Sequence, residues 1–187
     1  MNRITRYYYK IAYHFSKKIR VKIARKLGVR FTEKKGEERC TIMTNPFDIF
    51  GSEPYLITIG KHVEITTGVR LITHDGGVWV LRDDPAYSDY DFFGPIKIGN
   101  NVFLGNNVIV LPGVTIGDNC IIGAGAIVTR DIPPDSVAVG IPAKVLENID
   151  DYKRKADKPG ALKTRKQNLK EKEKHIRDAH PEWFGSS

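Results

Sequence analysis

The stretch from Ile98 to Leu146, IGNNVFLGNNVIVLPGVTIGDNCIIGAGAIVTRDIPPDSVAVGIPAKVL, repeats itself every six residues. Its aliphatic residues recur at Ile98, Leu104, Val110, Ile116, Ile122 and Val128, and a small or apolar residue stands four positions after each. The same spacing occurs upstream at Ile59, Ile65 and Leu71. A continuous helix needs a period near 3.6 residues and a simple strand meander needs a period of two, so this pattern fits neither.

A six-residue period is typical of a chain that forms a short strand, turns a corner and repeats. Three such sides make one coil of a triangular solenoid, in which the aliphatic residue points inward and stacks on its equivalents in the next coils. Gly, Asn and Asp stand between the aliphatic positions, as in Asn100-Asn101 and Asp118-Asn119, and these residues tolerate corner backbone. The repeat therefore predicts an all-β solenoid.

The repeat is interrupted once, by a loop excursion over residues 75–95. This segment contains five aspartates together with Trp79, Tyr87, Tyr90, Phe92 and Phe93. An excursion of this length in a tight solenoid is either functional or disordered, and its aromatic residues favour an ordered loop that contacts something.

Charge divides the chain into three parts: residues 1–30 carry +10, residues 31–149 carry −6 and residues 150–187 carry +4. The first part is predicted to be a basic amphipathic helix from Arg3 to Arg30, the second the β-helix domain, and the third a basic tail that is helical or irregular. The helix has an apolar stripe at Tyr7, Ile11, Phe15, Ile19, Ile23 and Leu27. This stripe fits packing on the domain or a neighbouring subunit, or else contact with an anionic membrane. No recognition motif accompanies the charge, so nucleic acid is not an expected partner.

Composition favours a cytoplasmic protein, with the inner face of the membrane as a peripheral alternative. The two cysteines, Cys40 and Cys120, make no disulfide framework, and the charged N-terminus does not resemble a signal peptide. No apolar run approaches the length of a membrane span. Cys120 falls on an inward position and is expected to pack in the core, while Cys40 has no identifiable activating base.

The run from Ile98 to Leu146 resembles the hexapeptide-repeat acetyltransferases, above all in its PGVTIG and GAGAIVTRD…GIPAK strings. The stretch from Gly51 to Asp75 resembles the branch that acetylates polysaccharides and sugars, which is related to the xenobiotic acetyltransferases. The resemblance implies a left-handed parallel β-helix, a homotrimer, and acetyl-CoA bound between adjacent subunits without a metal. It also implies one catalytic histidine where the excursion leaves the coil, which is His74 here.

The chemistry agrees with that assignment. A sugar hydroxyl is a poor nucleophile at neutral pH, and a neutral imidazole can take its proton as the oxygen attacks a thioester carbonyl. Of the other histidines, His62 falls on an outward turn position and is expected to be solvated.

Further site residues are implied by matching positions in the family. Those expected at acetyl-CoA are Phe103, Gly105, Asn106, Ala124, Thr129 and Lys144. Phe103 replaces the tryptophan that is common in the sugar enzymes, and Lys144 matches a basic residue near the nucleotide phosphates. Asn45 and Glu53 are candidates for binding the sugar or glycan acceptor, and Glu53 is alternatively a residue that orients His74.

The predicted function is an O-acetyltransferase that acts on a sugar or a polysaccharide precursor of the capsule, O-antigen or exopolysaccharide type. Three alternatives stay open: an N-acetyltransferase of an amino-sugar nucleotide, a streptogramin-like xenobiotic O-acetyltransferase, and a scaffold without catalysis. A zinc hydratase on the same solenoid would need three histidines per metal, and residues 31–149 contain only His62 and His74. The aspartates of the excursion lack calcium-loop spacing.

Overall fold

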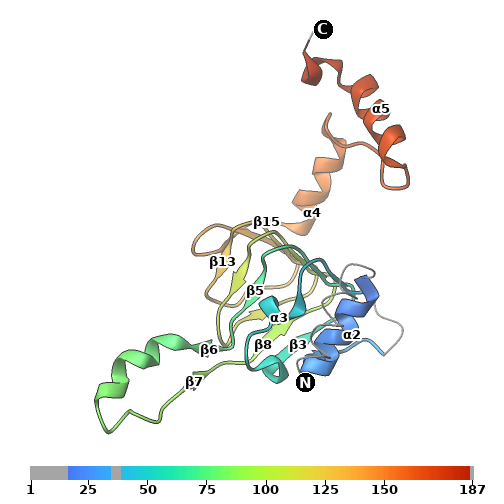
Figure 1. The fold of residues 1–187 in the computed structure, drawn as a ribbon. Helices are drawn as coiled ribbons and strands as arrows, with labels where there is room; N and C mark the ends of the chain where they lie inside the picture. The colour runs from blue at the N-terminus through green and yellow to red at the C-terminus, as the bar shows by residue number, and fades with distance from the viewer. Residues whose placement is uncertain (1–16, 35–38, 186–187) are drawn as a thin grey trace. The chain divides into compact units, whose positions relative to one another are not determined.

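The computed structural model describes residues 17–34 and 39–185. The chain divides into two compact units, Met1–Ile149 and Asp150–Ser187, and the first holds the repeat. Its strands are two to five residues long and lie side by side in successive coils (Figure 1).

Among the described residues, three sheets form the sides of these coils. One sheet contains β1 (Arg30–Phe31), β3 (Ile57–Ile59), β8 (Ile96–Ile98) and β11 (Thr115–Ile116). The second contains β2 (Thr41–Ile42), β4 (Glu64–Ile65), β9 (Phe103–Leu104), β12 (Ile121–Ile122), β14 (Ser136–Val139) and β15 (Lys144–Asn148). The third contains β5 (Arg70–Leu71), β10 (Ile109–Val110) and β13 (Ile127–Val128).

The register of these sheets confirms the predicted coil. Ile98 pairs in parallel with Ile116, and Leu104 pairs with Ile122, so one coil takes 18 residues, or three six-residue repeats. Ile59 pairs with Ile98 across 39 residues, which is one coil plus the 21 residues 75–95. The excursion therefore leaves the ladder without shifting its register.

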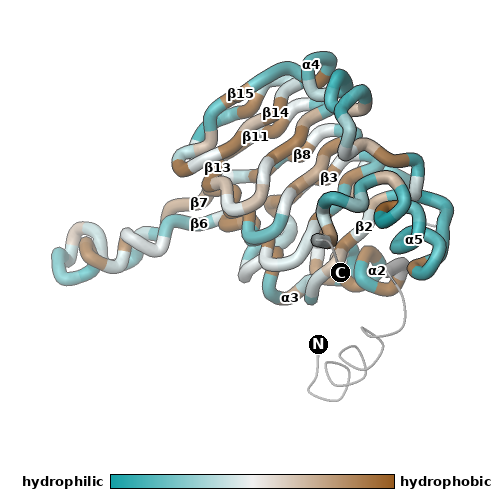
Figure 2. The backbone as a smooth tube through the Cα atoms, turned by 90° about the horizontal axis from the view of Figure 1, so that it is seen from above, coloured by the Kyte–Doolittle hydropathy of each residue, from teal (hydrophilic) through white to brown (hydrophobic). Residues whose placement is uncertain are grey.

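The inward position of each repeat forms one continuous core. All nine aliphatic residues that define the period are buried, with at most 3% of their surface exposed. Figure 2 shows the hydrophobic strand segments at the same place in neighbouring coils. Cys120 is buried in this core as predicted, and its pKa is raised, chiefly by burial. Cys40 is buried as well, and burial raises its pKa to about 12, so it is a poor nucleophile.

The parallel pattern ends at β15, which runs antiparallel to β14. The chain turns back through Gly140, whose φ is +98°, and the Ala143 N–H bonds to the Ile127 carbonyl. The last strand is thus an antiparallel addition to the end of the parallel β-helix, because the turn around Pro142 reverses the chain instead of starting another coil.

One corner of the coils is held by a ladder of side chains. His62, Asn101, Asn119 and Asp135 all have φ between +54° and +57°, and each bonds to the next at 2.8–3.0 Å. A left-handed backbone conformation is unfavourable for residues other than glycine, and Asn and Asp adopt it more readily than the rest. His62 is exposed, in agreement with its predicted solvated position.

The N-terminal segment is described from α2 (Lys17–Leu27) onward, and the part of the predicted helix before residue 17 lies outside the described residues. Val21, Ile23 and Ala24 are buried in the first unit, and α2 packs against β2 and against α3 (Pro46–Ile49). Over its described length, the apolar face of the helix is therefore covered by the domain, as in the packing interpretation.

The excursion is an ordered arm that projects from the coils (Figures 1 and 2). It begins with β6 (His74–Asp75), continues through the 3-10 helix η2 (Gly76–Asp83), and returns through β7 (Phe92–Phe93), which pairs antiparallel with β6. Arg82 and Asp91 form an ion pair at 2.7 Å across the arm. Most of its large apolar residues are exposed.

The second unit is small and largely polar. It contains most of α4 (Ile149–Lys153), the 3-10 helix η3 (Arg154–Asp157), α5 (Leu169–Ala179) and the 3-10 helix η4 (Pro181–Phe184). His180 is buried against Trp183, with the two rings stacked at 3.8 Å, and its Nε2 lies 2.7 Å from the Pro159 carbonyl oxygen. The helical or irregular tail that the sequence predicts is thus present.

Candidate active site

His74 stands where the chain leaves the third sheet to enter the arm. It follows β5 by three residues and opens β6, and 43% of its side-chain surface is exposed. Because β6 pairs with β7, the backbone at this histidine is fixed by a two-stranded ribbon rather than by the coil ladder. An imidazole that is half exposed on a fixed backbone is well placed to meet a solute.

The Glu53 side chain contacts the imidazole ring of His74. The Nδ1 atom of His74 lies 2.9 Å from Glu53 Oε2, and the Thr73 hydroxyl donates to the same oxygen at 2.8 Å. Glu53 stands just before the 3-10 helix η1 (Pro54–Leu56), and only 14% of its side chain is exposed. The chain thus brings together two residues that are 21 positions apart in the sequence.

The charge of Glu53 determines which ring nitrogen of His74 can act as a proton acceptor. Burial acts to raise the pKa of Glu53, but hydrogen bonds from the side chains of His74, Thr73 and Ser52 outweigh it and lower that pKa below its ordinary 4.5. An ionised carboxylate only accepts hydrogen bonds, so the Nδ1 atom of His74 carries the proton. When such a ring is neutral, its lone pair lies on Nε2, and that atom can accept a proton from a hydroxyl.

Thr73 was not predicted as a site residue. It is buried, with 1% of its surface exposed, and its hydroxyl turns to Glu53 instead of to the core. The only feature of the sequence that could have pointed to Thr73 is its position next to His74. The hydrogen bond from its hydroxyl to Glu53 becomes visible only in the fold.

Asn45, a candidate for acceptor binding, has a structural role in the chain. It caps the N-terminus of α3, and its side-chain oxygen accepts a hydrogen bond from the Phe47 N–H at 3.2 Å. A role at an acceptor stays a prediction for this residue.

The residues expected at acetyl-CoA fall at different places on the coils. Gly105, Asn106 and Ala124 lie together at the corner between the second and third sheets, where the Gly125 N–H donates to the Asn106 carbonyl at 2.7 Å. A Cβ on Gly105 would come within 2.6 Å of the Ala124 nitrogen, so close stacking of the coils alone requires glycine here.

Thr129 and Lys144 lie at another corner and line one pocket, together with Arg130, Asp131, Ile132, Pro142, Ala143 and Val145. Thr129 leaves the third sheet after β13, just as the segment before His74 leaves that sheet after β5, two coils away. Within one chain, Thr129 therefore lies at the same corner of the coils as His74, whereas the group of Gly105, Asn106 and Ala124 lies at the neighbouring corner.

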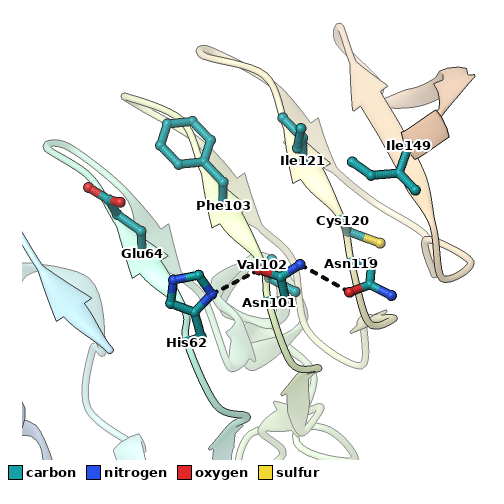
Figure 3. A pocket seen from close by; sticks show the side chains of 9 residues that line it. All are labelled: His62, Glu64, Asn101, Val102, Phe103, Asn119, Cys120, Ile121 and Ile149. Atoms are coloured by element: carbon teal, nitrogen blue, oxygen red, sulfur yellow. Dashed lines mark hydrogen bonds between the residues drawn. The ribbon is translucent and has the colours of Figure 1, made fainter. Parts of the chain in front are cut away.

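Phe103 lies on the outer face of the second sheet, with 40% of its surface exposed. It stands between Glu64 and Ile121 of the adjacent strands and lines a pocket with them (Figure 3). The corner ladder of His62, Asn101 and Asn119 bounds the same pocket. An exposed aromatic ring beside polar corner residues can hold a flat or apolar part of a ligand.

Within residues 17–34 and 39–185, no group of three or more His, Cys, Asp or Glu side chains could hold a metal ion. No helix in that part of the chain is both long and apolar enough to cross a membrane.

The chain belongs to the bacterial hexapeptide-repeat transferases. The family model described as "Bacterial transferase hexapeptide (six repeats)" matches residues 95–130. Protein CapG of Staphylococcus aureus is 46% identical over 152 residues, which cover 81% of this chain and 84% of that protein. The galactoside O-acetyltransferase of Escherichia coli K12 is 46% identical over 106 residues, which are 56% of this chain and only half of that enzyme.

Solved structures agree with this assignment. The hexapeptide-repeat acetyltransferase VCA0836 of Vibrio cholerae superposes with a TM-score of 0.57 over 79% of this chain and 90% of that one, and its 24% identity supports the fold alone. The maltose O-acetyltransferase of Clostridium difficile 630 superposes with a TM-score of 0.51 at 29% identity, over 76% and 85% of the two chains. The predicted class, an acetyltransferase of the hexapeptide-repeat kind, is confirmed.

Proposed function

We propose that this protein transfers the acetyl group of acetyl-CoA to a hydroxyl of a sugar or of a polysaccharide precursor, with His74 as the general base. The observation that carries the proposal is the pair of His74 and Glu53 at the base of the arm, where the chain leaves the third sheet. Relatives named as galactoside and maltose O-acetyltransferases support the sugar hydroxyl as acceptor.

The proposed reaction is a direct transfer. His74 Nε2 takes the proton of the acceptor hydroxyl while the acceptor oxygen bonds to the thioester carbonyl carbon. The carbon–sulfur bond then breaks, and the leaving thiolate of coenzyme A takes the proton back from His74. Glu53 keeps the ring in the required tautomer and stabilises the imidazolium that forms between these steps.

The residues present fit acetyl-CoA in two respects. The pocket of Thr129 and Lys144 also contains Arg130, and cations of this kind suit the phosphates of a nucleotide. The exposed ring of Phe103 suits the less polar thiol end of the molecule, and backbone N–H groups of the groove would stabilise the oxyanion.

We further propose that the protein works as a homotrimer with left-handed coils, as the family resemblance implies. His74 and the group of Gly105, Asn106 and Ala124 lie at different corners of one chain. A neighbouring copy packed against the corner of His74 would bring its own acetyl-CoA residues to that histidine. Light scattering of the purified protein tests the assembly, and a monomer at micromolar concentration would contradict it.

The proposed location is the cytoplasm. Peripheral contact with an anionic membrane is a separate hypothesis for the N-terminal segment, which carries +10 over residues 1–30. Co-flotation with vesicles that contain phosphatidylserine tests it, and equal recovery with neutral vesicles would contradict it.

The experiment that tests the activity is a transfer assay. The protein is incubated with acetyl-CoA and a panel of glycosides, oligosaccharides, amino-sugar nucleotides and a streptogramin, and products are found by a mass increase of one acetyl group. Mild base removes an O-acetyl ester and leaves an N-acetyl amide, so the same samples separate the two kinds of product. A base-labile acetyl group on a glycan supports the proposal. Transfer only to amines, only to the streptogramin, or to nothing would contradict it.

A further inference from the structure

The ribbon at the base of the arm places a specific side chain beside the candidate base. The strands β6 and β7 pair antiparallel at the base of the arm (Figure 1). In this pairing, His74 is opposite Phe93, and Asp75 is opposite Phe92. Opposed residues of an antiparallel pair project from the same face of the ribbon, and successive residues alternate between its two faces. Phe93 therefore shares a face with His74, while Phe92 projects from the other face with Asp75.

The hydrogen bond next to this pair shows how close the two positions are. The Gly94 N–H donates to the Thr73 carbonyl at 2.8 Å, so the bond flanks the pair and His74 and Phe93 exchange none themselves. Side chains approach each other most closely in such non-hydrogen-bonded pairs, where opposed Cβ atoms lie about 5 Å apart.

Phe93 is also open to solvent. It has 56% of its surface exposed, and Phe92 on the other face has 46%. A phenyl ring offers no hydrogen bond, so its contribution next to a base is apolar surface. The carbon face of a pyranose ring presents C–H groups and carries its hydroxyls at the rim. A pyranose laid on this ring would therefore keep its apolar face on Phe93 and turn a rim hydroxyl toward the imidazole.

We propose that Phe93 is a specificity-determining residue that selects cyclic sugars, by stacking on the pyranose while His74 deprotonates one of its hydroxyls. This inference rests on the proposed function and adds the form of the acceptor: a ring with an apolar face, in preference to the corresponding open-chain polyol.

The test compares two acceptors in four forms of the full-length protein. The acceptors are methyl β-D-galactopyranoside and galactitol, an open-chain polyol, and the forms are wild type, Phe93→Ala, Phe93→Tyr and Phe92→Ala. Initial rates with saturating acetyl-CoA give kcat/KM for each acceptor, and a second series gives KM for acetyl-CoA. Phe92→Ala is the matched control, because it removes the same side chain from a neighbouring exposed position on the opposite face.

We expect wild type to prefer the galactoside, and Phe93→Ala to lose about tenfold in kcat/KM for it. The rate with galactitol and the KM for acetyl-CoA should stay within about twofold, and Phe93→Tyr and Phe92→Ala should both behave like wild type.

Four results would overturn the inference. Equal losses in Phe93→Ala and Phe92→Ala, or equal losses with both acceptors, would mean that no ring is selected at this position. A change of oligomeric state in Phe93→Ala, seen by light scattering, would mean that the ring packs against another copy of the chain. If wild type acetylates no pyranoside, including those of the wider panel, the proposed function fails as well, whereas the other results leave it standing.

Discussion

The coils and the arm differ in how they treat their apolar side chains: the coils bury them, and the arm exposes most of them. In the coils, all nine residues of the period are buried and each corner is repeated from one coil to the next. In the arm, Trp79, Tyr87 and Phe93 are about half exposed or more. Burial of apolar surface stabilises the coils, and the buried aliphatic side chains take no part in the proposed chemistry. The break in the repeat is where an imidazole is both fixed and accessible, and the comparison therefore separates the source of stability from the candidate chemistry.

The largest effect is expected from a charge placed inside a coil. Ile98→Asp would bury a carboxylate without a partner in the core, where Ile98 has 3% of its surface exposed. The cost is about 4 kcal/mol or more, which is comparable to the whole stability of many domains. Circular dichroism during thermal unfolding should show little or no folded protein.

The matched control for this variant is Lys97→Asp, one residue away on the outer face of the same strand. Its unfolding free energy should change by about 0.5 kcal/mol or less. Similar stability losses in the two variants would contradict the inward and outward assignment of β8.

An intermediate effect is expected from Glu53→Gln, which keeps the shape of the side chain and removes its charge. The lost charge-assisted hydrogen bond amounts to about 1.5–3 kcal/mol in the transition state, so kcat should fall by about 10- to 150-fold. A glutamine side chain can also donate to Nδ1, which allows the wrong tautomer of His74. A kcat equal to that of wild type would show that Glu53 does not orient the base.

The Glu53→Gln variant should also change how the stability of the protein depends on pH. The pKa of Glu53 lies below its ordinary 4.5 in the folded protein, so its ionised form stabilises the fold. That contribution is fully present above about pH 4.5 and is lost as the pH falls through the lowered folded value. Melting temperatures between pH 7 and pH 3 should therefore fall less steeply in Glu53→Gln than in wild type.

The smallest effect is expected at the corner ladder. Asn119→Ala keeps the left-handed φ of +56° unrelieved and removes bonds to Asn101 and Asp135, which together cost about 1–2 kcal/mol. Asn119→Gly loses the same bonds but relieves the backbone, so it should be the more stable of the two variants in urea unfolding. The opposite order would show that backbone strain does not govern the corner.

Sequence alone was sufficient for the coils but not for the arm. The six-residue period determines which side chains are buried, because every coil repeats the same geometry, and the register confirms it. Periodicity is interrupted over residues 75–95, and the pairing of His74 with Phe93 depends on where the arm returns. The contact of Glu53 with Thr73 also needs the fold, since 20 residues separate the two side chains.

The reversal at β15 shows the same limit at the other end of the repeat. The aliphatic positions of the hexapeptide period end at Val128, so the period does not indicate that the chain turns back after Gly140.

The decisive experiment replaces His74 by alanine and measures kcat for acetyl transfer to a pyranoside and the melting temperature on the same samples. If His74 is the general base and does not contribute to the stability of the coils, kcat should fall by about two to four orders of magnitude and the melting temperature should stay almost unchanged. A kcat within a few fold of that of wild type would contradict this role of His74, and so would a fall in activity that merely follows unfolding.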